Sequence, residues 1–222
     1  IYNAQHFFYK HLLGFYYMAN FTKEQIEYLK TEFNVSRETL SRISQYQELL
    51  ISENENLNLI GKSTIEDFYN RHILDSLQLL KFIKNKSIPL IDLGTGAGIP
   101  GIILSIAGIS EVILIESKTK KCNFLENASK ISNNSIKIIN SRIEEIENLG
   151  IVNITARAFA PLEKIFKTSY DLLTTANQII LLKGQNINEE VKIAKKNWKF
   201  NLKLYDSIAA RDSKIIEIFS VQ

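Results

Sequence analysis

The chain has 222 residues, of which 45% are hydrophobic and 23% are charged, and its formal net charge is +3. This composition excludes a chain that is disordered over most of its length, and the small positive charge permits a polyanionic partner without indicating one. A single cysteine, Cys122, excludes an internal disulfide and a cysteine-based metal centre, so we expect a reducing compartment and no metal site.

The first twenty residues form an aromatic segment that polar residues interrupt. Asn3, Lys10 and His11 break it well short of membrane-spanning length, and it lacks the apolar run and cleavage site of a secretory signal. Because the single methionine is Met18, we expect translation to begin there. Residues 1–20 are therefore predicted to be an extension or disordered.

The next part of the chain is predicted to be helical. Between residues 24 and 80, apolar side chains such as Leu40, Ile43 and Leu50 recur at helical spacing. We therefore expect an N-terminal helical subdomain over residues 21–87.

Two local signals divide this helical region. The polar residues 54–58 predict a break between two helices. Ser63 followed by Glu66 fits a capping box, which predicts a helix start just before Phe68.

From residue 88 onward, short apolar runs alternate with helical patterns. Helices are expected at residues 118–131 and 162–173, and a terminal antiparallel hairpin at 202–208 and 215–221. This alternation predicts an α/β fold with a doubly wound, mostly parallel sheet over residues 88–222. The runs expected to be parallel strands are residues 88–93, 112–115, 136–139, 151–155 and 179–182.

A glycine-rich loop follows the first predicted strand. Residues 92–101 read DLGTGAGIPG, and glycines at 94, 96 and 98 let a nucleotide-like ligand approach the backbone at the sheet edge. The spacing differs from the dinucleotide fingerprint, and Asp92 places a carboxylate where a pyrophosphate would be repelled. A sulfonium donor with an amino-acid tail tolerates that carboxylate, so the loop favours S-adenosylmethionine over NAD. The alternative is a tight turn without a ligand.

Three further positions are predicted at the same sheet edge. Glu116 ends the second strand, where an acid accepts hydrogen bonds from ribose hydroxyls, although it fits a helix cap equally well. Ile143 and Glu144 follow the third strand, where backbone groups read an adenine edge or form a plain surface turn. Arg157 ends the fourth strand and is a binding candidate or a structural ion-pair partner.

Together these motifs resemble the bacterial methyltransferase G family of the small ribosomal subunit, also called the glucose-inhibited division protein B family. The resemblance covers about residues 21–221, and RHILDS at residues 71–76, just ahead of the glycine loop, is its most distinctive element. It also rests on NLNLI at 56–60, the loop at 92–101, ES at 116–117 with Lys120, SRIEE at 141–145, TARA at 155–158 and KG at 183–184.

The resemblance implies a Rossmann-like, S-adenosylmethionine-dependent enzyme of the cytoplasm that methylates N7 of one guanine in 16S rRNA. We expect a monomer that acts on 16S rRNA or the 30S subunit, with no membrane association. At the hairpin tip, Arg211-Asp212 departs from the Arg-His or Arg-Asn of many members. The predicted donor-binding residues, from the loop and the resemblance together, are Asp92, Gly94, Gly96, Gly98, Ile99, Glu116, Ile143, Glu144 and Arg157.

The predicted RNA-binding residues have structural alternatives. Arg71 and Asp75 could form a salt bridge within one helix, His72 could be a satisfied core residue, and Phe159 could pack in the core instead of stacking on a base. Because guanine N7 carries a free lone pair, we expect no catalytic acid or base, and catalysis by proximity and orientation alone. The predicted RNA contacts are Arg71, His72, Lys120, Phe159, Lys183 and Arg211.

Two other functions remain open at this point. A methyltransferase for a small molecule or a protein would share the donor pocket, and a non-catalytic RNA-binding or ribosome-assembly factor would share the fold. Transfer of labelled methyl groups to 16S RNA distinguishes an rRNA enzyme from a methyltransferase for a small molecule or a protein. Affinity for the donor distinguishes an enzyme from a non-catalytic factor.

Overall fold

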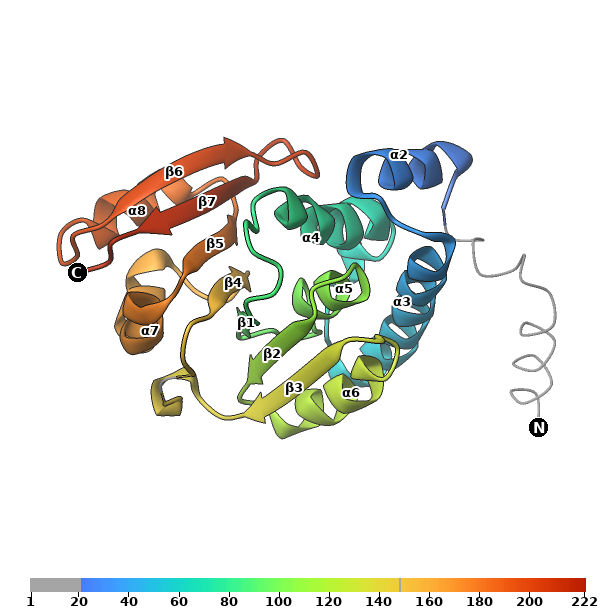
Figure 1. Cartoon of the computed structure of the whole chain (residues 1–222), viewed down its shortest axis with the longest axis horizontal. Coiled ribbons are helices and arrows are strands. Elements are labelled where there is room, and N and C mark those ends of the chain that lie inside the picture. Colours follow the sequence, from blue (N-terminus) through green and yellow to red (C-terminus); the bar gives the residue numbers. More distant parts are fainter. Residues whose placement is uncertain (1–20, 148) are drawn as a thin grey trace.

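A computed structural model describes residues 21–147 and 149–222, so the predicted extension and the start at Met18 lie outside the described residues. A seven-stranded sheet runs through the molecule with helices on both faces (Figure 1). The strand order is β3-β2-β1-β4-β5-β7-β6, with β1 to β5 parallel and β7 antiparallel to both β5 and β6. The predicted doubly wound sheet with a terminal hairpin is confirmed.

Each predicted strand is present. The strands are β1 Leu90–Leu93, β2 Glu111–Glu116, β3 Ser135–Asn140, β4 Asn153–Arg157, β5 Gln178–Lys183, β6 Asn201–Asp206 and β7 Lys214–Phe219. The helices are α2 Lys23–Phe33, α3 Arg37–Leu57, α4 Asp75–Leu77, α5 Gly101–Ile106, α6 Thr119–Ser129, α7 Leu162–Thr175 and α8 Ile187–Ala194. Within the described residues there are also four short helices: η2 Lys62–Thr64, η3 Tyr69–Leu74, η4 Gln78–Lys81 and η5 Ile143–Glu145.

Two buried clusters hold the helices against the sheet. One joins α3, α5 and α6 to one face, and the other joins α7 and α8 to the opposite face (Figure 1). Leu40 of α3 and Leu90 of β1 belong to the first cluster, so side chains from both sides of residue 87 share one core. Division into two subdomains at that residue stays a prediction.

The register of the central strands determines where the site lies. Asp92 of β1 pairs with Leu114 of β2 and with Thr155 of β4, so the three strands end at the same edge. The glycine loop (residues 92–101), Glu116 and Arg157 therefore meet there, as expected for a doubly wound sheet.

Several local predictions were wrong. Helix α3 continues through residues 54–57 because buried Asn54 stays helical and its Oδ1 accepts the Ile60 amide at 2.8 Å. Ser63 lies inside η2 and caps nothing there, whereas a capping box forms between Thr22 and Gln25.

The remaining differences concern strand β4 and helix α8. Strand β4 begins at Asn153, because Ile151 is 69% exposed. Helix α8 was not predicted. Among the described residues, no helix combines the length and apolar character needed to cross a membrane.

Candidate donor-binding site

Asp92 supports the glycine loop through hydrogen bonds from within the core. It is fully buried, and its Oδ2 accepts hydrogen bonds from the Thr95 hydroxyl at 2.5 Å and the Gly101 amide at 3.0 Å. Burial raises the pKa of the carboxyl to about 7. Asp92 does not line the cavities beside the loop. The predicted direct donor contact is therefore corrected to support of the loop.

Asp92→Asn is expected to change how stability depends on pH. The folded-state pKa is raised from 3.8 to about 7, so the folded wild type binds the proton more tightly than the unfolded chain. Wild-type stability should then fall as pH rises from about 4 to 7, by at most about 4 kcal/mol, and the uncharged amide of the variant cannot contribute to this fall. Urea unfolding of both proteins at pH 4 to 8 measures the difference. Parallel pH curves would show that Asp92 does not titrate in this window.

Three of the four glycines in the loop have different roles. Gly94 and Gly96 adopt φ angles of +61° and +60°, and a Cβ on Gly94 would lie 2.2 Å from the Phe159 ring. A Cβ on Gly98 would instead lie 2.4 Å from Ile102, so this glycine is needed for packing of the loop on α5. Only close backbone approach at Gly94 and Gly96 bears on a ligand.

Tyr46 fixes the far side of the loop. It is fully buried in α3, and its hydroxyl donates to the Ala97 carbonyl at 2.7 Å. An N-terminal helix thus holds the loop in place. Tyr46 was not predicted as a site residue, because within a helical apolar repeat a tyrosine is indistinguishable from an ordinary core residue.

Glu116 faces the loop from the end of β2. It is 7% exposed, and its two oxygens accept the Gly96 amide at 3.1 Å and the Lys118 amide at 2.8 Å. Glu116 thus accepts the amide of Lys118, the residue just before α6, and it also lines two cavities, while its contact with a ribose stays a prediction. Each carboxylate oxygen keeps acceptor capacity for a further donor, as a ribose diol requires.

Three adjoining cavities share Ala158, a non-glycine residue at φ +50°. The first cavity, about 410 Å³, is lined by Gly94, Glu116, Ile143 and Glu144. The second, about 380 Å³, is lined by Gly96, Ile99, Glu116 and Arg157. The third, about 460 Å³, is lined by Arg71, Asp75, Arg157, Phe159, Lys183 and Ser213.

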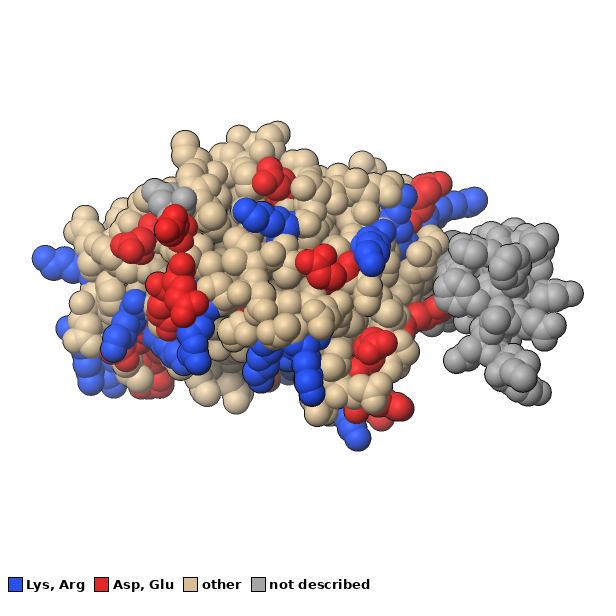
Figure 2. Space-filling model, turned by 90° about the horizontal axis from the view of Figure 1, so that it is seen from below, with Lys and Arg blue, Asp and Glu red and all other residues tan. Residues whose placement is uncertain are grey.

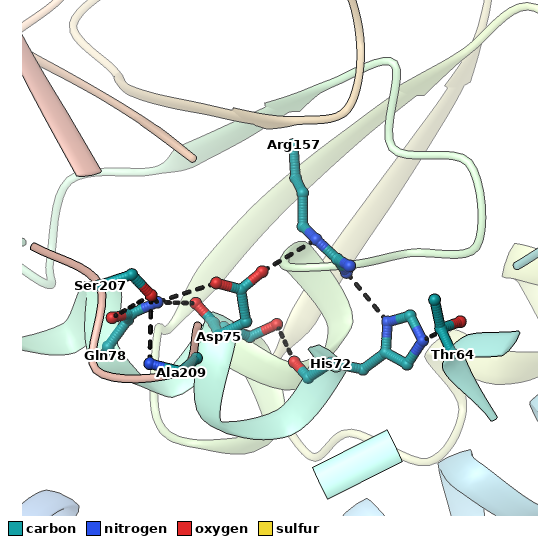
Figure 3. Close-up of polar contacts among 8 residues, drawn as sticks. Thr64, His72, Asp75, Gln78, Arg157, Ser207 and Ala209 are labelled. Carbon is teal, nitrogen blue, oxygen red and sulfur yellow. Dashed lines mark hydrogen bonds and ion pairs between the residues drawn. The ribbon is translucent and has the colours of Figure 1, made fainter. Parts of the chain in front are cut away.

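Arg157 lies at the centre of a buried polar network. Its Nε is 3.0 Å from Asp75 Oδ2, and its Nη1 donates to His72 Nδ1 at 3.0 Å (Figure 3). Because Nδ1 accepts, Nε2 carries the proton and donates to Thr64 Oγ1 at 2.8 Å. Burial, with the nearby charge of Arg157, lowers the pKa of His72 to about 3, so the ring is neutral at physiological pH.

This network corrects two expectations. His72 is buried and both ring nitrogens are hydrogen bonded, so the structure does not present the ring to a phosphate or a base. Asp75 pairs with Arg157, not with Arg71 as a helical neighbour.

The other predicted RNA contacts are placed differently from one another. Arg71 and Arg211 are exposed beside the third cavity, and half-buried Phe159 lies between the first and third cavities. Lys120 is exposed at a separate hollow beside Asn58. The Lys183 side chain, in contrast, is almost fully covered.

The charge of Lys183 is paired within the protein. Its side chain is 8% exposed and donates to the Ala160 carbonyl and to Glu190 Oε2, each at 2.6 Å. Glu190 also accepts the Leu162 amide, so the cluster fixes the loop after β4. The prediction that Lys183 contacts phosphate is corrected, because its charge is already paired.

Surface charge gives little guidance to a partner. Figure 2 shows Lys and Arg side chains in separate small groups with Asp and Glu between them, not one continuous basic surface. This mixture agrees with the small net charge. The cavities, and not the charge, therefore define the candidate site.

The fold and the cavities around the glycine loop define a class, the Rossmann-like methyltransferases. Solved structures of a ribosomal protein L11 methylase from Lactobacillus delbrueckii subsp. bulgaricus and an rRNA methylase from Streptococcus thermophilus share the fold, each with a TM-score of 0.50. The L11 methylase is 14% identical to this chain, and the match covers 66% of this chain and 76% of the methylase. The rRNA methylase is 11% identical, and the match covers 65% of this chain and 93% of that enzyme.

The family is defined more closely by sequence. Residues 39–216 match the model of rRNA small subunit methyltransferase G. Curated proteins named "Ribosomal RNA small subunit methyltransferase G" from Rickettsia akari and Rickettsia typhi are 46% and 47% identical over 184 residues, which span 83% of this chain and 95% of each relative. The chain belongs to the rRNA small subunit methyltransferase G family.

Proposed function

We propose that the protein transfers the methyl group of S-adenosylmethionine to N7 of a guanine in 16S rRNA. The single observation that carries the proposal is the meeting of the cavities at Ala158: Glu116 and the glycine loop line the first two, and Arg71 and Phe159 lie where these two adjoin the third. The family name adds the substrate class, since the curated relatives are named for the RNA of the small ribosomal subunit.

The residues present fit the donor. The buried Glu116 carboxylate would accept both ribose hydroxyls, and the backbone of Ile143 and Glu144 would lie beside the adenine in the first cavity. The open backbone at Gly96 leaves room for the amino-acid part of the donor near Ile99 and Arg157, in the second cavity. When bound, S-adenosylmethionine supplies a methyl group activated by its sulfonium.

The side chains around the second and third cavities orient groups and do not need to move a proton. Guanine N7 attacks with a free lone pair, so catalysis requires alignment of the nucleophile with the methyl carbon and the leaving sulfur. Phe159 offers a ring against which a base could stack at the boundary of the cavities. Arg157, held by Asp75 and His72, gives that boundary a fixed wall.

The substrate would be 16S rRNA or the assembled 30S subunit, and the protein would act as a monomer in the cytoplasm, where these substrates are found. Exposed Arg71, Lys120 and Arg211 are the residues proposed to contact phosphates.

The test is methyl transfer from labelled S-adenosylmethionine to several acceptors from a strain that lacks this modification. We expect label in 30S subunits or naked 16S rRNA, and the comparison of the two identifies the substrate form. Label confined to a protein or small-molecule fraction would support the second kind of methyltransferase. Absence of both donor binding and methyl transfer would support an assembly factor.

A further inference from the structure

Gln78 joins the substrate side of the site to the C-terminal hairpin. This glutamine is 1% exposed and begins η4, three residues after Asp75. Its Nε2 donates to Asp75 Oδ1 at 2.9 Å and to Ser207 Oγ at 3.0 Å (Figure 3). Its Oε1 accepts the Ile208 amide at 3.0 Å. One side chain thus holds the Arg157 partner and the β6–β7 loop together.

The β6–β7 loop (residues 207–213) forms part of the third cavity. Ala210 and Ser213 line this cavity, and exposed Arg211 lies between them. Within the loop, Ser207 Oγ accepts the Ala209 amide at 3.1 Å, and the Ser213 amide donates to Ala210 at 3.1 Å. These bonds shape the loop, whereas the bonds to Gln78 fix it to the wall that carries Asp75.

We propose that Gln78 is a positioning residue for the RNA substrate, which it serves by anchoring the β6–β7 loop over the third cavity. The proposal rests on the proposed function, because the third cavity is the substrate side in that account. Gln78 itself lines none of the three cavities, and the β6–β7 loop that it anchors lines the third cavity only, so its effect should fall on the RNA more than on the donor.

The chain provides a matched control in Gln178. This glutamine is 7% exposed and also links the N-terminal region to the C-terminal hairpin, but it lies at the start of β5, away from the site. Its Nε2 donates to Phe82 O at 2.9 Å and to Glu217 at 2.8 Å, and its Oε1 accepts the Lys84 amide at 3.3 Å. Each glutamine therefore accepts one backbone amide: Gln78 accepts that of Ile208 in the hairpin, and Gln178 accepts that of Lys84 in the N-terminal region.

The experiment compares Gln78→Met and Gln178→Met with the wild-type protein. Gln78→Met should lower kcat/KM for RNA on the order of tenfold, because a buried amide and carboxylate lose their partner, while the donor dissociation constant changes less than twofold. Gln178→Met should leave both quantities within about twofold, although it loses similar bonds. A purely structural role for Gln78 predicts equal effects from the two variants, which would overturn the proposal.

Hydrogen exchange gives a readout that does not depend on activity. Gln78→Met should speed exchange of the Ile208 amide about tenfold and leave the Lys84 amide unchanged, and Gln178→Met should do the reverse. If Gln78→Met does not fold, Ser207→Ala removes the Gln78–Ser207 bond from the loop side and should lower kcat/KM for RNA in the same direction, by a smaller factor. Unchanged exchange at Ile208 in the folded variant overturns the proposal. This result is decisive even if the wild-type protein methylates no RNA, which would refute the proposed function separately.

Discussion

Replacing Glu116 with alanine is expected to raise the dissociation constant for S-adenosylmethionine by about 100-fold or more. The change removes the carboxylate and, with it, two charge-assisted hydrogen bonds to the ribose, each contributing roughly 1.5–3 kcal/mol. It would also release the Gly96 and Lys118 amides, which the carboxylate holds at 3.1 and 2.8 Å. Glu116→Gln keeps the shape and one acceptor, so its effect should be smaller, about tenfold.

Equilibrium dialysis with labelled donor measures these constants. Glu111 provides the matched control, because it lies at the opposite end of β2 and is exposed. Glu111→Ala should leave donor binding unchanged. Wild-type affinity in Glu116→Ala would place the ribose elsewhere and contradict the site described above.

Replacing Arg157 with methionine is expected to destabilise the fold by about 3 kcal/mol and to abolish methyl transfer. The change leaves the Asp75 carboxylate, 13% exposed, without its cation, and a buried charge without a partner is costly. It also removes the hydrogen bond that holds the His72 ring. Both effects reach the boundary between the second and third cavities.

A double-mutant cycle with Asp75→Asn isolates the ion pair. Removing both charges should cost less than the sum of the single changes, because neither partner then remains buried alone. Urea unfolding measures all four proteins. The ion pair of Lys214 and exposed Asp206 serves as a surface control, for which Asp206→Asn should have little effect. Additive costs at Arg157 and Asp75 would show that their pairing contributes nothing.

The sequence predicts the parts of the site that depend on local pattern. Alternating apolar runs locate the strand ends, so the glycine loop, Glu116 and Arg157 could be expected at one edge of the sheet. The distinction between a loop glycine and a packing glycine could not be predicted. Gly98 meets Ile102 in space, and the repeating glycines alone do not show this.

Residues that act across long sequence separations were missed for a physical reason. Tyr46 reaches Ala97, and Gln78 reaches Ile208, through contacts that no local pattern encodes. The role of His72 was also mistaken, because its ring is fixed by Arg157, 85 residues further along the chain. Lys183 looks like a free cation in the sequence until the structure shows Glu190 beside it.

The most direct test of the donor site is a calorimetric titration of the folded wild-type protein with S-adenosylmethionine and with its demethylated product. We expect one molecule of either compound to bind per chain, in competition with each other, with NAD not binding. Absence of heat from both compounds in well-folded protein would contradict the assignment of the cavities around Gly94, Gly96 and Glu116.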